Sequence, residues 1–405
     1  MKRQPKVAIM FGIFGPYIVA RVNALAAYCE VVGIEGSEAD DVYAWDKYVD
    51  ADCFRRITLF TDAPISQKNF ADVDAKVTAA LDTIKPDVVA VPGWSAGYAH
   101  SMLLWALHHR IPAIVMSDSG KQDSDRPWWR ELVKRGIVAR FSAGLVGGQR
   151  HVDYLSSLGM PSERIFTGYD VVDNAHFGIG AGRARRQAAT CRIELGLPER
   201  YFLASARFVE KKNLHRLIAA FAAYRAVAGS EAWNLVLLGD GNLRPHIEQQ
   251  INHLGLGNAI TMPGFKQYAE LPAYYGLASA FVHASTSEQW GLVVNEAMAS
   301  GLPVIVSNRC GCTPELVEDG ENGFVFDPFD IGALAGMMSH VASPECDRVS
   351  MGEKSRKIVE RWTPESFAQG LISAIQVALS VPQMRTHDVQ YVLLRTITRL
   401  HARTM

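Results

Sequence analysis

The sequence predicts an α/β protein built from two doubly wound domains in tandem, and three observations indicate it. Short apolar runs rich in β-branched residues alternate with longer amphipathic segments along most of the chain. Continuous apolar strands separated by helices are typical of parallel sheets that helices cover on both faces. The alternation breaks once, near residues 170–180, and then starts again. The length of 405 residues also fits two large domains, since one domain takes roughly 100–200 residues.

The first half of the chain contains seven candidate strands, with helices predicted between most of them, for example over residues 71–84 and 102–109. We therefore expect a first doubly wound domain at residues 1–174. Its strand candidates are Val7–Phe11, Val31–Glu35, Arg56–Phe60, Val88–Val91, Ala113–Met116, Leu145–Gly147 and Arg164–Thr167.

The second half repeats the pattern, and we expect a second doubly wound domain at residues 175–384. The tail at residues 385–405 is basic and helical in pattern, and we expect it to pack back on the first domain. The strand candidates are Tyr201–Ser205, Asn234–Leu238, Ala259–Met262, Ala280–His283, Val304–Val306 and Gly323–Phe326. The helix candidates are 214–226, 243–254, 292–300, 331–341, 351–362 and 364–379.

The composition excludes several classes of protein. The 41 basic and 42 acidic side chains give a formal net charge of -1, so we expect no general binding of nucleic acid. Six cysteines are too few for a disulfide scaffold, and the lone Cys310/Cys312 pair lacks a second pair at zinc spacing. No apolar run reaches the roughly 18 residues that span a bilayer, and no signal peptide is evident. We therefore expect a cytoplasmic protein.

The segment 285–305 carries the strongest motif. A strand is expected to end near Ala284, a polar loop follows, and Gly291 opens a helix that ends at Gly301. The free amides of Gly291, Leu292 and Val293 would then form an anion site of the kind that binds phosphates.

Two carboxylates, Glu288 and Glu296, flank this predicted anion site. Carboxylates bind phosphate poorly, but they accept hydrogen bonds from hydroxyls such as those of a sugar and a ribose. The alternative is that Glu288 is an ordinary loop charge and Glu296 a solvated residue on the helix.

A basic loop opens the second domain. It follows the strand Tyr201–Ser205 and precedes a helix, which puts Arg207 and Lys212 at the carboxyl end of a strand. Two cations at that position suit a diphosphate. A solvated basic loop is the alternative, and Lys211 is the weaker candidate.

Taken in order, these motifs resemble those of the donor-binding domain of retaining glycosyltransferases of family 4, which have the GT-B fold: two Rossmann-like domains that face each other across a cleft. The resemblance covers residues 201–330 closely and the remainder loosely. The matching motifs are Arg207 with Lys212, Val236 to Gly241, Pro263-Gly264-Phe265, Glu288 with Glu296, Glu315-Leu316-Val317 and Gly320 to Gly323.

The resemblance implies a role for each matching residue in binding a nucleotide-sugar. Arg207 and Lys212 would bind the diphosphate, Glu288 the hydroxyls of the sugar, and Glu296 the ribose. The donor site would be completed by Gly15, Gly239, Gly264, Phe265, Gly291, Leu292 and Val293. Family members usually need no metal ion, so we expect neither a metal nor a cofactor. Asp123-Ser124-Asp125 matches a metal-binding D-x-D motif, but its place in a predicted loop favours coincidence.

In the first domain, the resemblance implies that a glycine-containing loop after the first strand approaches the donor phosphates and the acceptor. Gly15 is the best match, and Tyr17 and Arg21 follow it on the next helix. The family often carries a histidine after the central strand of this domain, but Ser117, Asp118 and Ser119 stand there instead. We expect Asp118 to orient an acceptor hydroxyl, with a loop or cap role as the alternative.

Aromatic side chains in the first domain provide two further candidates. Trp94 and Tyr98 follow another strand end and could stack on a sugar or other ring acceptor, with core packing as the alternative. The segment 126–135 mixes Trp128 and Trp129 with four basic side chains. It is either a solvated helix face or a peripheral contact with an anionic membrane, which would suit a lipid-linked acceptor.

The sequence thus predicts a metal-independent, retaining glycosyltransferase of the hexosyltransferase type, with Arg207, Lys212 and Glu288 as catalytic residues. The partners would be a nucleotide-sugar donor and a hydroxyl acceptor: a saccharide, a lipid-linked group or a small molecule. The alternatives are a non-catalytic sugar-nucleotide binding protein and an epimerase or phosphorylase of the same fold.

Overall fold

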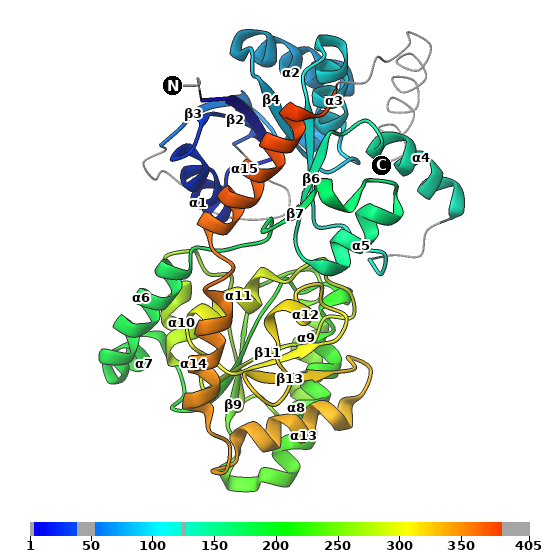
Figure 1. The fold of residues 1–405 in the computed structure, drawn as a ribbon. Coiled ribbons are helices and arrows are strands. Elements are labelled where there is room, and N and C mark those ends of the chain that lie inside the picture. Colours follow the sequence, from blue (N-terminus) through cyan, green and yellow to red (C-terminus); the bar gives the residue numbers. More distant parts are fainter. Residues whose placement is uncertain (1–3, 39–52, 124–126, 383–405) are drawn as a thin grey trace. The chain divides into compact units, whose positions relative to one another are not determined.

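The computed structural model describes residues 4–38, 53–123 and 127–382. The chain divides into two compact units (Figure 1). The first comprises the described residues up to Val171 together with those from Pro364 to 382, and the second comprises residues 172–363. All six cysteines lie within the described residues and are free thiols, as the sequence predicts. None of the helices described is long and apolar enough to cross a membrane.

The first unit is built on a seven-stranded sheet with the order β3-β2-β1-β4-β5-β6-β7. All neighbouring strands pair in parallel, and the inner strand β1 is almost completely buried, so helices must cover both faces. The strands are β1 (Lys6–Phe11), β2 (Glu30–Ser37), β3 (Arg55–Phe60), β4 (Val88–Pro92), β5 (Ala113–Ser117), β6 (Ala143–Val146) and β7 (Ile165–Thr167).

Most of the helices described in the first unit connect one strand to the next, as in a doubly wound fold. They are α1 (Pro16–Ala26), η1 (Ile65–Gln67), α2 (Phe70–Ile84), α3 (Gly97–His109), α4 (Trp128–Val138), α5 (Gln149–Ser157), η2 (Ser162–Arg164) and α15 (Pro364–Ser380).

Helix α15 corrects the predicted domain boundaries. The sequence analysis places residues 364–380 in the second domain, whereas the structure assigns α15 to the first unit, where it packs on α1, β6 and β7 (Figure 1). Its apolar side chains Phe367, Leu371 and Ile375 are all buried there. An amphipathic pattern shows which face of a helix is buried but not which domain buries it. The tail at 385–405 lies outside the described residues.

The second unit is built on a six-stranded parallel sheet with the order β10-β9-β8-β11-β12-β13. Its strands are β8 (Tyr201–Ser205), β9 (Asn234–Leu238), β10 (Ile260–Gly264), β11 (Ala280–His283), β12 (Val304–Ser307) and β13 (Gly323–Phe326). Its helices are α6 (Asn174–Arg186), α7 (Ala188–Leu195), η3 (Glu210–Lys212), α8 (Leu214–Ala228), η4 (Gly229–Glu231), α9 (Arg244–His253), α10 (Leu271–Leu277), α11 (Leu292–Ala299), α12 (Thr313–Leu316), α13 (Ile331–Ala342) and α14 (Arg348–Val359).

The predicted class of two doubly wound parallel sheets is confirmed, and several strands match to the residue. Two helices begin several residues earlier than predicted: α3 at Gly97 rather than at Met102, and α14 at Arg348 rather than at Met351. Asp347 explains the start of α14, because its carboxylate accepts a hydrogen bond from the Ser350 amide at 3.0 Å and caps the helix.

Candidate functional site

The candidate site of the second unit lies at the carboxyl ends of its central strands, where open α/β sheets bind ligands. Asn213 fastens the loop after β8 to the loops after β11 and β13. Its side-chain amide donates to the carbonyls of Ala284 at 3.0 Å and Pro328 at 2.8 Å. The Asn213 backbone is left-handed, with φ of 57°, a conformation that asparagine tolerates better than most residues. This turn places Lys212 beside the β11 loop.

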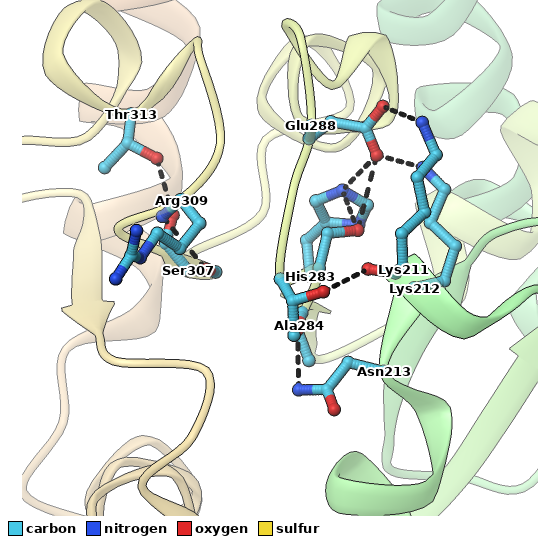
Figure 2. A network of polar contacts seen from close by, with 11 residues as sticks. Lys211, Lys212, Asn213, His283, Ala284, Glu288, Ser307, Arg309 and Thr313 are labelled. Atoms are coloured by element: carbon cyan, nitrogen blue, oxygen red, sulfur yellow. Dashed lines mark hydrogen bonds and ion pairs between the residues drawn. The ribbon is translucent and has the colours of Figure 1, made fainter. Parts of the chain in front are cut away.

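Lys212 and Glu288 form an ion pair between the ammonium group and the Oε2 carboxylate oxygen (Figure 2). Their side chains are only 11% and 13% exposed. Lys211 lies 4.0 Å from the other oxygen, Oε1, and is 42% exposed. The structure therefore brings together two predicted site residues and leaves Lys211 nearer to solvent.

Two residues that the sequence analysis did not select, His283 and Ser285, also hold Glu288. The Nε2 atom of His283 lies 3.5 Å from Oε2 of Glu288, and the Ser285 hydroxyl lies 3.3 Å from both atoms (Figure 2). His283 and Ser285 are fully buried. The position of His283 as the last residue of a strand was the signal available in the sequence.

The pKa values in this cluster fix its charges. Burial by itself raises the pKa of Glu288, but the hydrogen bond from His283 and the charge of Lys212 outweigh it and hold that pKa well below the usual range. Burial lowers the pKa of His283 despite the neighbouring Glu288 carboxylate. At neutral pH the carboxylate is therefore ionised and the imidazole neutral. Because a carboxylate only accepts, the proton of His283 that bonds it is on Nε2.

The main chain holds the Glu288 loop from two sides. The Thr286 amide donates to the carbonyl of Lys211 at 2.8 Å, and the Gly311 amide donates to the carbonyl of Glu288 at 3.0 Å. Gly311 belongs to the turn after β12. A hydrogen bond of 2.8 Å from the Thr313 hydroxyl to the Ser307 carbonyl stabilises that turn (Figure 2). The loop that carries the Glu288 carboxylate is therefore hydrogen-bonded to both the loop after β8 and the turn after β12.

Helix α11 begins where the sequence predicts. Gly291 is its N-cap residue, with a positive φ of 105° that favours glycine. The first amides of a helix have no partner within the helix, which leaves those of Leu292 and Val293 available to an anion. Their binding of phosphate stays a prediction.

Glu296 is buried on α11 rather than solvated. Its Oε2 atom accepts a hydrogen bond of 2.6 Å from the phenol of Tyr275, on α10. Burial, reinforced by the Glu296 charge, raises the pKa of Tyr275 well above its usual value, so the phenol stays protonated as a donor. The alternative of a solvated helix charge is thereby excluded, while contact with a ribose stays a prediction.

Gly239 has a structural reason to be glycine. Its φ is 120°, and a Cβ atom there would lie 1.9 Å from the carbonyl oxygen of Ala206, beside Arg207. The Gly239 amide donates to the Gly264 carbonyl at 3.0 Å. Gly239 therefore joins the loops after β8, β9 and β10, and these loops carry the half-buried Arg207 and Phe265.

In the first unit, Gly15 is the N-cap residue of α1, and Tyr17 lies in the first turn of that helix. Arg21 is buried one turn further on. Its Nε and Nη2 atoms donate to the carbonyl of Val171 at 3.1 and 2.9 Å, and its guanidinium lies 5.4 Å from the Tyr169 ring centre. The predicted acceptor residue Arg21 thus lies beside the segment that follows β7.

The other predicted acceptor residues separate into two groups. Asp118 directly follows β5, and Tyr98 is half-buried on α3 with its hydroxyl close to Gly12. Trp94 instead belongs to the apolar core of the first unit, with its ring 6.3 Å from that of Tyr154. A buried ring cannot offer its face to an acceptor, so the core-packing alternative fits Trp94.

Among the described residues, no group of three or more His, Cys, Asp or Glu side chains has the arrangement of a metal site. In the D-x-D motif, Asp123 accepts a hydrogen bond of 2.7 Å from the Gly120 amide, which is a loop-stabilising role. Ser124 and Asp125 lie outside the described residues. Independence from metal ions stays a prediction.

Residues 192–358 match the family model of glycosyl transferases group 1. This part of the chain is similar to group 1 glycosyltransferase domains. The matched residues include the ion pair of Lys212 and Glu288 and the whole of α11.

Sequence relatives of the chain carry glycosyltransferase names. The alpha-monoglucosyldiacylglycerol synthase of Acholeplasma laidlawii is 33% identical over 144 residues, which are 35% of each chain. The putative colanic acid biosynthesis glycosyltransferase WcaL of Salmonella typhimurium is 28% identical over 258 residues, or 62% of this chain and 59% of that protein. The chain therefore spans about a third and three-fifths of the length of these two relatives.

Solved structures share the fold over almost the whole chain. Anabaena HepE, in complex with UDP, superposes with a TM-score of 0.71 at 19% identity, covering 92% of this chain and 99% of that one. Sucrose-phosphate synthase of Thermosynechococcus elongatus gives a TM-score of 0.73 at 20% identity, covering 93% and 100%. The predicted GT-B fold class, with its two Rossmann-like domains, is confirmed.

Proposed function

We propose that this protein is a retaining, metal-independent glycosyltransferase that moves a sugar from a nucleotide-diphosphate sugar to a hydroxyl of its acceptor. The observation that carries the proposal is the ion pair of Lys212 and Glu288 in a segment similar to group 1 glycosyltransferase domains, one loop away from the free amides of α11. A cation, a carboxylate and a helix N-terminus at one sheet edge supply the groups that a diphosphate and a sugar need.

In this proposal the donor displaces the internal ion pair. Lys212 turns from Glu288 to the diphosphate, where Arg207 and the amides of Leu292 and Val293 complete the anion site. The Glu288 carboxylate, still bonded by His283 and Ser285, then accepts hydrogen bonds from the sugar hydroxyls. Glu296, held by Tyr275, accepts from the ribose.

The bond to be broken joins the sugar to the diphosphate, and negative charge develops on the diphosphate as it leaves. Arg207, Lys212 and the α11 amides stabilise that charge from fixed positions, which is usually the largest catalytic effect. Removing one such contact should reduce the rate on the order of 10²–10³-fold, as for an oxyanion-hole donor.

The proposal that the configuration of the sugar is retained is supported by the contacts of the Glu288 carboxylate. Its carboxylate is bound by Lys212, His283 and Ser285, which makes it a poor nucleophile and a good hydroxyl acceptor. We therefore propose attack by the acceptor on the face from which the diphosphate leaves, with the diphosphate taking the acceptor proton. The structure of HepE was determined with UDP-glucose as well as UDP, and we extend that donor class to this chain.

A second part of the proposal concerns α4, which could contact an anionic membrane. Trp128 is 74% exposed, and Trp129 and Leu132 are also exposed on this helix, beside Arg130 and Arg135. Exposed tryptophans with arginines suit the interface of an anionic bilayer. Arg126 of the same segment lies outside the described residues. Cosedimentation with phosphatidylglycerol vesicles tests the contact: Trp128→Ser with Trp129→Ser should abolish binding, and equal binding by both proteins would contradict it.

The function is tested by measuring release of nucleoside diphosphate from a panel of nucleotide-sugars, with and without candidate acceptors. A transferase releases the diphosphate faster when acceptor is present. Binding of a nucleotide-sugar without turnover over a broad acceptor panel would favour a non-catalytic binding protein. Interconversion of sugar nucleotides would indicate an epimerase, and activity with inorganic phosphate but no nucleotide a phosphorylase.

A further inference from the structure

A second polar cluster, in the first unit, contains a residue with no assigned role. Asp170 lies three residues beyond the end of β7, and it is only 4% exposed. Its Oδ2 atom is buried without a hydrogen-bond partner. Because an unsatisfied buried polar atom is costly, native proteins retain very few of them without a purpose.

The nearest cation does not satisfy Asp170. Arg21 lies close enough to influence its carboxyl group electrostatically, but the Nε and Nη2 donors of Arg21 are directed at the Val171 carbonyl. The Arg21 guanidinium also lies over the Tyr169 ring. The protein therefore holds an arginine beside Asp170 without closing the Oδ2 atom into an ion pair.

A second carboxyl group, that of Asp118, lies close enough to influence Asp170 electrostatically. Asp118 directly follows β5, and β5 and β7 lie on either side of β6 in the sheet. Neighbouring strands are about 4.8 Å apart, so these two strand ends are roughly 10 Å apart. Ligands of open α/β sheets bind at the carboxyl ends of strands, which is where both residues lie.

The electrostatics oppose ionisation of both carboxyl groups at the same time. Burial, followed by the nearby Asp118, raises the pKa of Asp170 well above its usual value, against the opposing effect of Arg21. Burial and Asp123 likewise raise the pKa of Asp118, against His151 and Arg21. Two carboxyl groups that resist ionising together can share one proton, and such a pair can both donate to and accept from hydroxyls.

We propose that Asp118 and Asp170 form the hydroxyl-binding pair for the acceptor, which is an uncharged, polyhydroxylated molecule such as an unmodified saccharide. The unsatisfied Oδ2 atom of Asp170 is the position that an acceptor hydroxyl completes. A phosphorylated acceptor fits poorly, because its phosphate would meet two carboxyl groups while Arg21 is engaged with Val171. This inference rests on the proposed glycosyltransferase function.

The first test compares acceptors with the wild-type full chain and a donor that the nucleotide screen identifies. The panel pairs unmodified sugars and polyols with their phosphate esters, and release of nucleoside diphosphate is the readout. We expect the unmodified members to support transfer. A panel in which only the phosphate esters act, or in which no sugar or polyol acts, overturns the inference.

The second test is Asp170→Asn, which keeps the shape of the side chain and removes its acid. The acceptor KM should rise on the order of tenfold, the effect of losing one hydrogen bond. The donor KM should change by a smaller factor than the acceptor KM. Asp153→Asn is the control, because it makes the same substitution on α5, where the Asp153 carboxylate bonds Gln149 at the surface.

The outcomes separate this inference from the function on which it rests. If the wild type releases no nucleoside diphosphate with any acceptor, the proposed function fails. If the wild type transfers sugar and Asp170→Asn keeps the wild-type acceptor KM, the function stands and the role of Asp170 is overturned. A variant that loses thermal stability but keeps that KM shows a structural role only and also overturns it. If Asp170→Asn does not fold, the inference is tested by the acceptor panel with the wild type alone.

Discussion

The ammonium group of Lys212 is paired with the carboxylate of Glu288, although 76 positions separate the two residues in the chain. The sequence assigns them to different parts of one donor, the diphosphate and the sugar. In the proposed complex with the donor, each of the two side chains would exchange the other for its own part of the donor. A partly buried pair that loses one partner leaves an uncompensated charge, so changes to either residue should affect the other.

The two adjacent lysines provide a matched comparison. Lys212→Met removes the ion pair and one diphosphate ligand, so we expect kcat/KM to fall on the order of 10²–10³-fold. Lys211→Met removes the same charge from a side chain that is 42% exposed, and its effect should be much smaller. Steady-state kinetics with saturating acceptor measures both. Equal losses would contradict the assignment of the diphosphate to Lys212.

His283 predicts a pH dependence of stability. Its pKa is lowered in the folded protein, chiefly by burial, so below about pH 6.5 the unfolded chain binds more protons there than the folded one. Its contribution to stability is therefore complete above that pH and is lost as the pH falls below it. His283→Gln should flatten this part of the curve, measured by urea unfolding at several pH values. The range between about pH 7 and pH 5 brackets the ordinary histidine pKa of about 6.5. If the free energy of unfolding changes with pH over that range equally in the wild type and in His283→Gln, the result would count against a neutral His283.

Glu296 and Tyr275 can be tested together. Tyr275→Phe removes the 2.6 Å hydrogen bond to a buried carboxylate, and stability should fall by about 1–3 kcal/mol. Glu296→Ala should weaken binding of the nucleoside diphosphate, because the ribose loses its hydrogen-bond acceptor. Isothermal titration calorimetry measures the binding. If Glu296→Ala binds the nucleoside diphosphate as tightly as the wild type does, the assignment of the ribose to Glu296 is wrong.

Two glycines with positive φ should respond differently to alanine. At Gly239 the added Cβ would meet the Ala206 carbonyl at 1.9 Å, whereas at Gly264 nothing lies within 4 Å of it. Gly264→Ala should cost only the backbone strain, about 1–2 kcal/mol. Gly239→Ala should cost more and also weaken donor binding, since it displaces the loop of Arg207. Thermal unfolding and calorimetry report the two effects, and similar behaviour of both variants would contradict the account.

The fold was largely predictable because local signals define it. The strands Tyr201–Ser205 and Gly323–Phe326 are apolar runs with clear boundaries, and the structure reproduces their limits. The helix opened by Gly291 was predictable for the same reason, since glycine marks its start. The placement of α15 was not predictable, because its buried face gives no information on which unit covers it.

The site was predictable only where a motif marks it. Lys212 and Glu288 belong to motifs that the sequence shows. Their direct pairing depends on the tertiary structure and could not be predicted from those motifs. His283, Ser285 and Asn213 were missed because a buried polar side chain looks like any other polar residue until its partners are known. The prediction that Trp94 binds the acceptor was wrong for the opposite reason. An aromatic residue after a strand fits a ligand site or a core equally well, and the structure places Trp94 in the core.

The most direct test of the account measures nucleoside diphosphate release from a nucleotide-sugar by the full chain, with and without acceptor, for the wild type and Arg207→Ala. We expect acceptor to accelerate release by the wild type. Arg207→Ala should keep its fold by circular dichroism and lose on the order of 10²–10³ in rate. Wild-type turnover by Arg207→Ala would remove that residue from the site. Release that no acceptor accelerates, over the whole panel, would contradict the glycosyltransferase function itself.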